Sequence, residues 1–301
     1  MNPITGLLAA LAAITALFVG GWARSITASK TKARFPNGLE IFIGALTNFF
    51  DALGIGSYAP TTALFRFFRV VDDRVIPGTM TVGHTLPSVI ETFIYTTVIS
   101  VDASTLLTMI GSSSLGAWLG AGIVARWPKR KVQIGMGIAL VVAASLMFMT
   151  QMKLFPGGGE STGVSGIRLV IAIAVNFILG ALMTIGIGMF APCMILVSLL
   201  GMNPKVAFPI MMGSAAFLMP VASIRFIREQ SYSPRAAFGL LVGGIPAVFL
   251  AAYIIKELPL EMVRWLVIAV VIYTSASMLW SAFSERSTPA AQPLATGAEL
   301  P

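Results

Sequence analysis

Charge, cysteine and histidine are all scarce in this chain, and each shortage excludes a class of function. Only 11% of its 301 residues are charged and 56% are hydrophobic, whereas a globular domain carries roughly 25% charge. The single cysteine and the single histidine exclude an internal disulfide and any metal site built from several such residues. The composition is that of an all-α protein that crosses the bilayer several times. We expect neither a cofactor nor a metal.

The excess of basic residues has a topological explanation. The chain has 20 Lys and Arg against 12 Asp and Glu, which gives a net charge of +8. These basic residues fall in short loops between apolar runs, where positive charge keeps a loop in the cytoplasm. We therefore expect the lipid bilayer, and not a nucleic acid, as the partner of this charge.

A glycine–proline motif occurs twice, 132 residues apart. Residues 53–64 read LGIGSYAPTTAL, and residues 185–196 read IGIGMFAPCMIL. Each copy interrupts an apolar run, because glycine and proline break helices. A matched pair of broken apolar segments in the two halves of a membrane protein is the best sequence pointer to a transporter's binding site.

The motif divides most of the chain into two repeats of four apolar elements. Residues 1–37 form an apolar segment followed by a basic loop. We interpret the apolar segment as an uncleaved transmembrane helix, because no positive charge precedes it. The repeats follow at residues 38–152 and 169–283, and each opens with its broken segment. A Gly/Pro-rich linker at 153–168 separates them. We expect the polar tail at 284–301 to be disordered.

The distribution of Lys and Arg favours re-entrant hairpins over segments that span the membrane. If every segment spans, ten basic residues fall on each side; if each broken segment enters and returns, fifteen fall inside and five outside. Positive charge is enriched on the cytoplasmic side. The second arrangement inverts the repeats relative to one another. It places the N-terminus outside, the C-terminus in the cytoplasm and the hairpin tips near the middle of the bilayer.

The two tips supply most of the candidate substrate-binding groups. Glycine frees backbone N–H groups there, and helices that restart after the tips present N-termini that favour an anion. The alternative is that the glycines and the cysteine serve helix packing. Hydroxyl groups and a histidine on the segments that follow the tips complete the set. The candidates are Gly54, Gly56, Ser57, Thr61, His84, Ser88, Gly186, Gly188, Cys193 and Ser214.

Three ionisable residues are candidates for proton or ion coupling. His84 and Glu91 share a helix face with Ser88, at spacing i, i+4, i+7, and ionisable residues at membrane depth usually face a cavity. The alternatives are a packing role for His84 and a position near the headgroups for Glu91. Asp51 precedes the first tip, where it would carry a proton or a cation, or form an ion pair with Arg66.

The repeats resemble the TauE/SafE family of sulfite exporters. In that family, a glycine-rich stretch leads to a proline. Residues 54–56 and 186–188, both Gly-Ile-Gly, stand at this place in the present chain and lack the additional glycines of the family's stretch. The pairs at 84–85 (His-Thr) and 214–215 (Ser-Ala) stand where Thr-Ser opens the family's next helix. The run at 111–122, GSSSLGAWLGAG, is similar to the family's third helix.

This resemblance covers residues 38–283 and implies a polytopic inner-membrane permease. It adds Thr85 to the candidate substrate-binding residues. We expect a bacterial secondary transporter of a small anion, such as sulfite, a sulfonate or another organic anion, and not an enzyme. The alternatives are a membrane assembly subunit that transports nothing and a membrane-embedded enzyme. The substrate, the coupling ion, the direction of transport and the oligomeric state are open at this point.

Overall fold

The chain is helical throughout most of the residues that the computed structural model describes, which are 3–28, 35–154, 158–186, 188–253 and 260–284. Seven helices there are long and apolar enough to cross a membrane, which confirms the prediction of an all-α, multi-pass membrane protein. The tail at 285–301, for which we predicted disorder, lies outside the described residues. The helices are α1 (Pro3–Ala28), α2 (Gly38–Ala52), α3 (Tyr58–Phe67), α4 (Ile76–Val98), α5 (Ala103–Val124), α6 (Lys129–Gln151), α7 (Gly166–Met183), α8 (Phe190–Leu199), α9 (Ala207–Arg228), α10 (Pro234–Tyr253) and α11 (Leu260–Ser284), with 3-10 turns η1 (Asp73–Val75) and η2 (Pro204–Val206).

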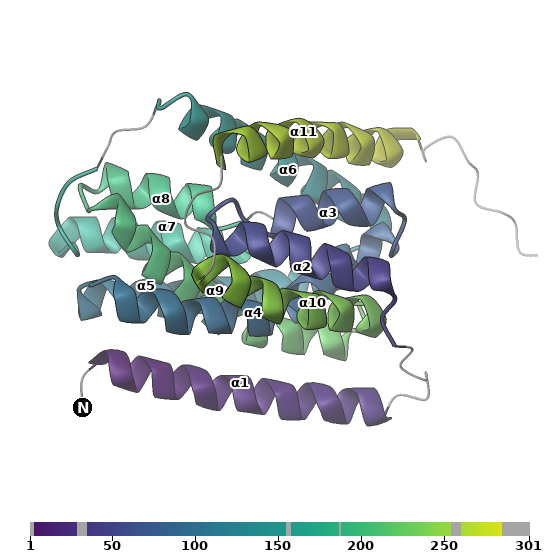
Figure 1. Cartoon of the computed structure of the whole chain (residues 1–301), viewed down its shortest axis with the longest axis horizontal. Helices are drawn as coiled ribbons and strands as arrows, with labels where there is room; N and C mark the ends of the chain where they lie inside the picture. The colour runs from purple at the N-terminus through teal and green to yellow at the C-terminus, as the bar shows by residue number, and fades with distance from the viewer. Residues whose placement is uncertain (1–2, 29–34, 155–157, 187, 254–259, 285–301) are drawn as a thin grey trace, which may run out of the picture.

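The first broken segment, α2 and α3, turns back on itself (Figure 1). At its start, the Glu40 carboxylate forms an ion pair with Arg235 at the beginning of α10, at 2.7 Å. Shortly after its end, the Thr79 hydroxyl accepts a hydrogen bond of 2.9 Å from the backbone N–H of Ser233. The start of α2, before the hairpin, and the start of α4, after it, therefore both lie beside the α9–α10 connection. We call this the basic end of the bundle; it also carries the α3–α4 and α5–α6 connections.

The second broken segment, α7 and α8, turns back in the same way. Arg168, near the start of α7, donates a hydrogen bond of 3.5 Å to the carbonyl oxygen of Leu200 at the end of α8. The chain that precedes α7 also pairs with the chain that follows α8, because Asn203 N–H donates to the Ser161 carbonyl at 2.8 Å. This hairpin thus begins and ends at one end of the bundle.

The course of α4 shows that the two hairpins enter from opposite ends. α4 begins at the basic end and is 23 residues long, which is about 35 Å at 1.5 Å per residue. Beyond it, the backbone N–H of Asp102 donates to the Thr162 carbonyl at 3.0 Å, so the α4–α5 connection lies beside the loop that precedes α7. In Figure 1 the hairpin tips meet between the two ends. α4 is not among the seven apolar helices, but most of its polar side chains are buried within the bundle.

Glycines in the left-handed backbone region make the breaks between the paired helices. Gly54 (φ 78°) and Gly56 (φ 94°) lie in the first tip, and Gly186 (φ 104°) lies in the second. Glycine adopts such angles readily because it has no Cβ atom. α3 begins at Tyr58 and α8 at Phe190, so both hairpins restart within the repeated motif, as the sequence predicted.

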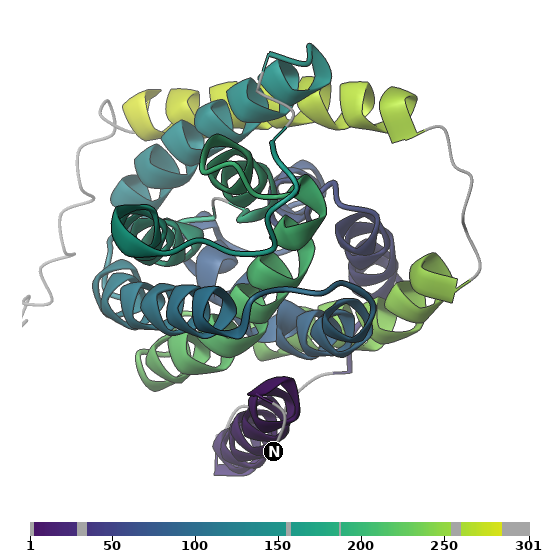
Figure 2. The ribbon, with the colours of Figure 1, turned by 90° about the vertical axis from the view of Figure 1, so that its left-hand side faces the viewer.

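The helices before residues 153–168 interlock with those after them, instead of forming two separate bundles. α2 packs along α10, and α7 packs along α5, so each hairpin lies against a helix of the other repeat. Glycines permit the close approach: a Cβ added at Gly116 would lie 1.9 Å from the Phe177 carbonyl oxygen, and one at Gly243 would lie 1.9 Å from that of Ile41. α6 and α11 cover one side of this core, and α1 lies on the other (Figure 2).

Replacing Gly116 by Ala should destabilise the protein by about 2 kcal/mol, because overpacking a close contact costs about 1–3 kcal/mol. Gly111→Ala is the matched control on the same helix. A Cβ there meets nothing within 4 Å, and alanine is the better helix former. The measurement is the thermal unfolding midpoint of both variants in detergent. Equal midpoints would contradict the close packing of α5 on α7.

Candidate functional site

The two hairpin tips meet at one small cavity. Its volume is ≈ 30 Å³, which is room for about two water molecules. Both tips contribute to its wall, together with α4 and α9, so both repeats enclose it. The residues that line it are Asp51, Gly56, Ser57, Tyr58, Ser88, Met183, Gly188, Met189, Met211, Met212, Ala215 and Met219.

The first tip is closed by Asp51. Its carboxylate accepts one hydrogen bond from the backbone N–H of Ser57 at 3.1 Å and another from the Ser57 hydroxyl at 2.7 Å. Ser57 is the residue before α3, so the carboxylate stands at the N-terminus of that helix. This is a position that favours an anion, because the first backbone N–H groups of a helix have no partner within it.

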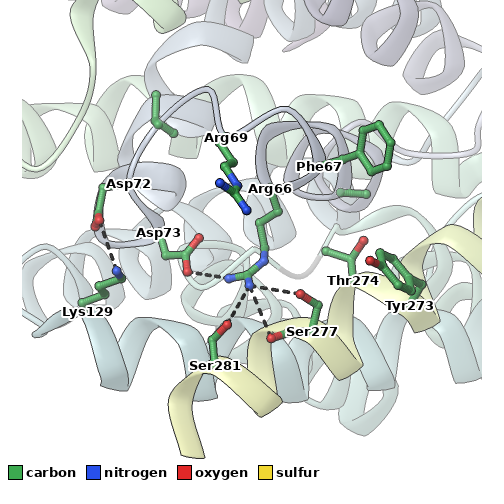
Figure 3. Close-up of a pocket in the computed structure, with 12 residues that line it drawn as sticks. Arg66, Phe67, Arg69, Asp72, Asp73, Lys129, Tyr273, Thr274, Ser277 and Ser281 are labelled. Carbon is green, nitrogen blue, oxygen red and sulfur yellow. Dashed lines mark hydrogen bonds and ion pairs between the residues drawn. The ribbon is translucent and has the colours of Figure 1, made fainter. Parts of the chain in front are cut away.

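Arg66 lies far from Asp51, and the ion pair between them that the sequence allowed does not form. Arg66 is near the end of α3, about 12 Å along the helix from its start. Its guanidinium contacts the carboxylate of Asp73 and, on α11, the hydroxyls of Ser277 at 3.2 Å and Ser281 at 3.1 Å. Figure 3 shows these contacts in a cavity of ≈ 620 Å³ at the basic end. Arg66 therefore ties the first hairpin to α11.

His84 joins the two helices of the first hairpin. Its Nδ1 lies 2.9 Å from Oδ1 of Asn48 on α2, and its Nε2 lies 3.0 Å from the Thr61 hydroxyl on α3. The Asn48 side-chain amide donates to the Gly44 carbonyl at 2.7 Å, which leaves Oδ1 of Asn48 as the acceptor toward His84. This network makes Nδ1 the donor to Oδ1 of Asn48, while Nε2 pairs with the Thr61 hydroxyl. Both ring nitrogens of His84 are thus hydrogen-bonded.

The other candidates on α4 differ in their surroundings. Ser88 lines the cavity, whereas the Thr85 hydroxyl donates to the Thr81 carbonyl of its own helix at 2.7 Å. Glu91 is enclosed by protein and not exposed to headgroups, and neither of its carboxyl oxygens has a hydrogen-bond partner among the described residues. No group of three or more His, Cys, Asp or Glu that could hold a metal ion occurs in this part of the chain.

The second tip is less polar than the first. Gly188 lines the cavity, whereas Gly186 faces the side chain of Met136. Cys193 is buried in α8, and the buried hydroxyl of Ser214 lies 3.1 Å from the Asn176 side-chain amide. Neither Cys193 nor Ser214 belongs to the cavity lining, and nor does Gly54, which borders a separate cavity of ≈ 90 Å³.

Methionines form much of the cavity wall, and sequence reasoning missed them. Met211, Met212 and Met219 come from α9, and Met183 and Met189 come from the second hairpin. The spacing of seven between Met212 and Met219, which places both on one helix face, was the available signal. Methionine is unbranched and flexible, so a wall of this kind adapts to different contents.

The comparisons with known proteins concern the second half of the chain. No curated protein and no solved structure matches the chain significantly. The family model described as sulfite exporter TauE/SafE matches residues 167–299, a range that includes the second tip and the cavity-lining part of α9. The chain is thus a multi-pass membrane protein with the signature of a transport family. The resemblance drawn from the glycine–proline motifs is confirmed over residues 167–299, which are similar to the sulfite exporter TauE/SafE family.

Proposed function

We propose that this protein is a secondary transporter that carries a small anion, such as sulfite, a sulfonate or another organic anion, across the bacterial cytoplasmic membrane. The observation that carries the proposal is the meeting of two oppositely directed hairpin tips at one cavity. Transporters built from inverted repeats bind their substrates at such a place, where broken helices direct their N-termini at anionic groups. The description of the matched family as a sulfite exporter agrees with a small anion as the cargo.

The N-terminus of α8 is the position that we assign to the anion. Its first backbone N–H groups have no partner within the helix, and no side chain caps it at Met189. The N-terminus of α3 already holds an internal anion, the Asp51 carboxylate. At the second tip, Met183 stands at the repeat position of Asp51, so no internal carboxylate competes there. Ser57 and Ser88 add hydroxyl groups to the same cavity.

The basic end faces the cytoplasm in this proposal, because positive charge is enriched on that side of a membrane. The N-terminus is then outside and the C-terminus in the cytoplasm. At the other end, the described basic residues outside α11 are Lys153, Arg168 and Lys205. Those at the basic end are Arg24, Arg66, Arg69, Arg74, Arg126, Lys129, Arg130, Lys131, Arg225, Arg228 and Arg235.

The cavity in its present size corresponds to a closed state between two open ones. A volume of ≈ 30 Å³ has room for only about two water molecules, which is too little for a sulfite or sulfonate ion together with its contacts. The methionine side chains in the wall can change rotamer to widen the site. Each hairpin packs on a helix of the other repeat, α2 on α10 and α7 on α5. Movement of one hairpin against that helix would open the cavity to one side of the membrane at a time.

The experiment that tests the proposal measures anion flux and anion binding by the purified protein. Proteoliposomes loaded with radiolabelled sulfite or taurine should release the label faster than liposomes without protein. In detergent, at least one of sulfite, thiosulfate, taurine, sulfoacetate and small carboxylates should raise the unfolding midpoint; at 100 times its Kd it stabilises by about 2.7 kcal/mol. Absence of flux together with absence of stabilisation by every anion would contradict transport.

A further inference from the structure

Glu91 is a buried carboxyl group that lacks the hydrogen bonds such a group needs. It has no exposed surface, and neither Oε1 nor Oε2 has a partner among the described residues. Ser88, three residues earlier on α4, lines the cavity between the tips. Because residues three apart lie on the same helix face, Glu91 stands one turn from the wall of the proposed anion site.

Few titratable groups face Glu91. Asp51 on α2 lies within electrostatic range of it, Tyr95 lies about one turn further along α4, and its hydroxyl contacts the carbonyl of Ala52. Tyr58 on α3 lines the same cavity. The elements that pack against α4 are α1, α2, α3, α9, α10 and η1. Apart from Asp51, the charged side chains that the structure describes on these elements lie at the basic end. These are Arg24, Glu40, Arg66, Asp73, Arg74, Arg225, Arg228 and Arg235.

The neutral acid is the form of Glu91 that this environment accommodates. A buried carboxylate without a partner is strongly disfavoured, and the neighbouring Asp51 carboxylate, which two hydrogen bonds from Ser57 stabilise, repels a second negative charge. His84 gives Glu91 no hydrogen bond, because its ring nitrogens pair with Asn48 and Thr61. An anion that enters the cavity adds one more negative charge and strengthens this requirement.

We propose that Glu91 is a proton-binding site that must be protonated before the cavity can close over its anion, so that the proton is bound together with the substrate. This inference rests on the proposed function. When the cavity opens, water reaches Glu91, and its carboxyl group can release the proton to that water. When the anion binds and the cavity closes, the carboxylate takes up one proton from water. Binding of the anion therefore tightens as the pH falls.

The equilibrium test uses isethionate, a sulfonate whose own charge does not change near neutral pH. In weakly buffered detergent solution, binding of isethionate should take up a proton, which a pH indicator records. The Kd of the wild type should rise by up to about tenfold per pH unit, the limit for one linked proton. Glu91→Gln, which keeps the shape and the neutral state, should bind isethionate with a Kd independent of pH and without proton uptake.

The matched control is Glu229→Gln, which removes a surface carboxylate paired with Arg126 and should keep the pH dependence of the wild type. Glu91→Met serves as a second neutral variant if Glu91→Gln does not fold. A pH-dependent Kd in the Glu91 variants would overturn the inference. Sodium dependence of binding in place of pH dependence would overturn it as well, because Glu91 would then bind a metal cation.

An infrared measurement on the ligand-free protein separates this inference from the proposed function. At a pH below the range in which anion binding takes up a proton, the ligand-free wild type should show the carbonyl stretch of a buried protonated carboxyl group, and the band should fade as the pH rises into that range. The Glu91 variants should lack this band, while Glu229→Gln keeps it. Absence of the band at every pH would overturn the protonated state of Glu91, whatever the protein transports. If the band is present but no anion binds or crosses, the proposed function fails, and the role of Glu91 as a proton partner of the anion fails with it.

Discussion

Replacing Gly188 by Leu should abolish anion transport and destabilise the fold by no more than about 1–3 kcal/mol, the usual cost of overpacking. Gly188 lines the cavity, and a Cβ added there meets no atom within 4 Å. Its φ lies outside the left-handed region, so a residue with a side chain fits its backbone. The leucine side chain would fill the ≈ 30 Å³ cavity and exclude the anion. We expect the flux in proteoliposomes to fall by at least about a hundredfold, the equivalent of about 2.8 kcal/mol of lost binding.

Gly111→Leu is the control for this variant. It adds the same side chain at an exposed glycine of α5 where a Cβ also meets nothing within 4 Å, so flux and unfolding midpoint should match the wild type. Gly56 and Gly186 are less informative positions. Their positive φ angles mean that any side chain there strains the backbone, and loss of flux could follow from loss of fold. Flux at the wild-type rate in Gly188→Leu would show that the anion does not pass through this cavity.

The hairpins could be predicted from the sequence because their signals are local or compositional. Glycine and proline break a helix wherever they occur, and the count of Lys and Arg requires no knowledge of packing. The positions of Gly54, Gly56 and Gly186 in the tips follow from the motif alone, and their positive φ angles agree with it. The contact between Thr61 and His84 was not predicted, although both were candidate residues.

The partners of the polar groups could not be predicted, because they depend on how the hairpin closes. Asp51 forms a hydrogen bond with Ser57 because the chain reverses direction between them. The partner that the sequence suggested for Asp51 was Arg66. Repeat spacing identifies equivalent positions but does not say which face of a helix meets the cavity. Cys193 and Ser214 therefore looked equivalent to cavity residues, yet they do not line it, and the methionines of α9 do.

Replacing His84 by Ala should destabilise the protein by about 3 kcal/mol. The change leaves Asn48 Oδ1 and the Thr61 hydroxyl, both fully buried, without their partner. Each orphaned polar group costs about 1–3 kcal/mol, and the empty space left by the ring adds to the loss. The measurement is the free energy of unfolding from denaturant titration in mild detergent. Because the first hairpin loses the link between α2 and α3, its tip should also become accessible to protease or hydrogen exchange before the rest of the bundle.

Thr85→Ala is the matched control for the His84 variant, because it alters the next residue of the same helix. The Thr85 hydroxyl donates a hydrogen bond to the carbonyl of Thr81 within α4. The helix does not depend on this side-chain hydrogen bond. The cost should therefore stay below about 1 kcal/mol. Equal losses in the two variants would show that His84 contributes only packing to α4. A loss confined to His84→Ala, with early exchange at the tip, would show that this histidine holds the first hairpin closed against the cavity.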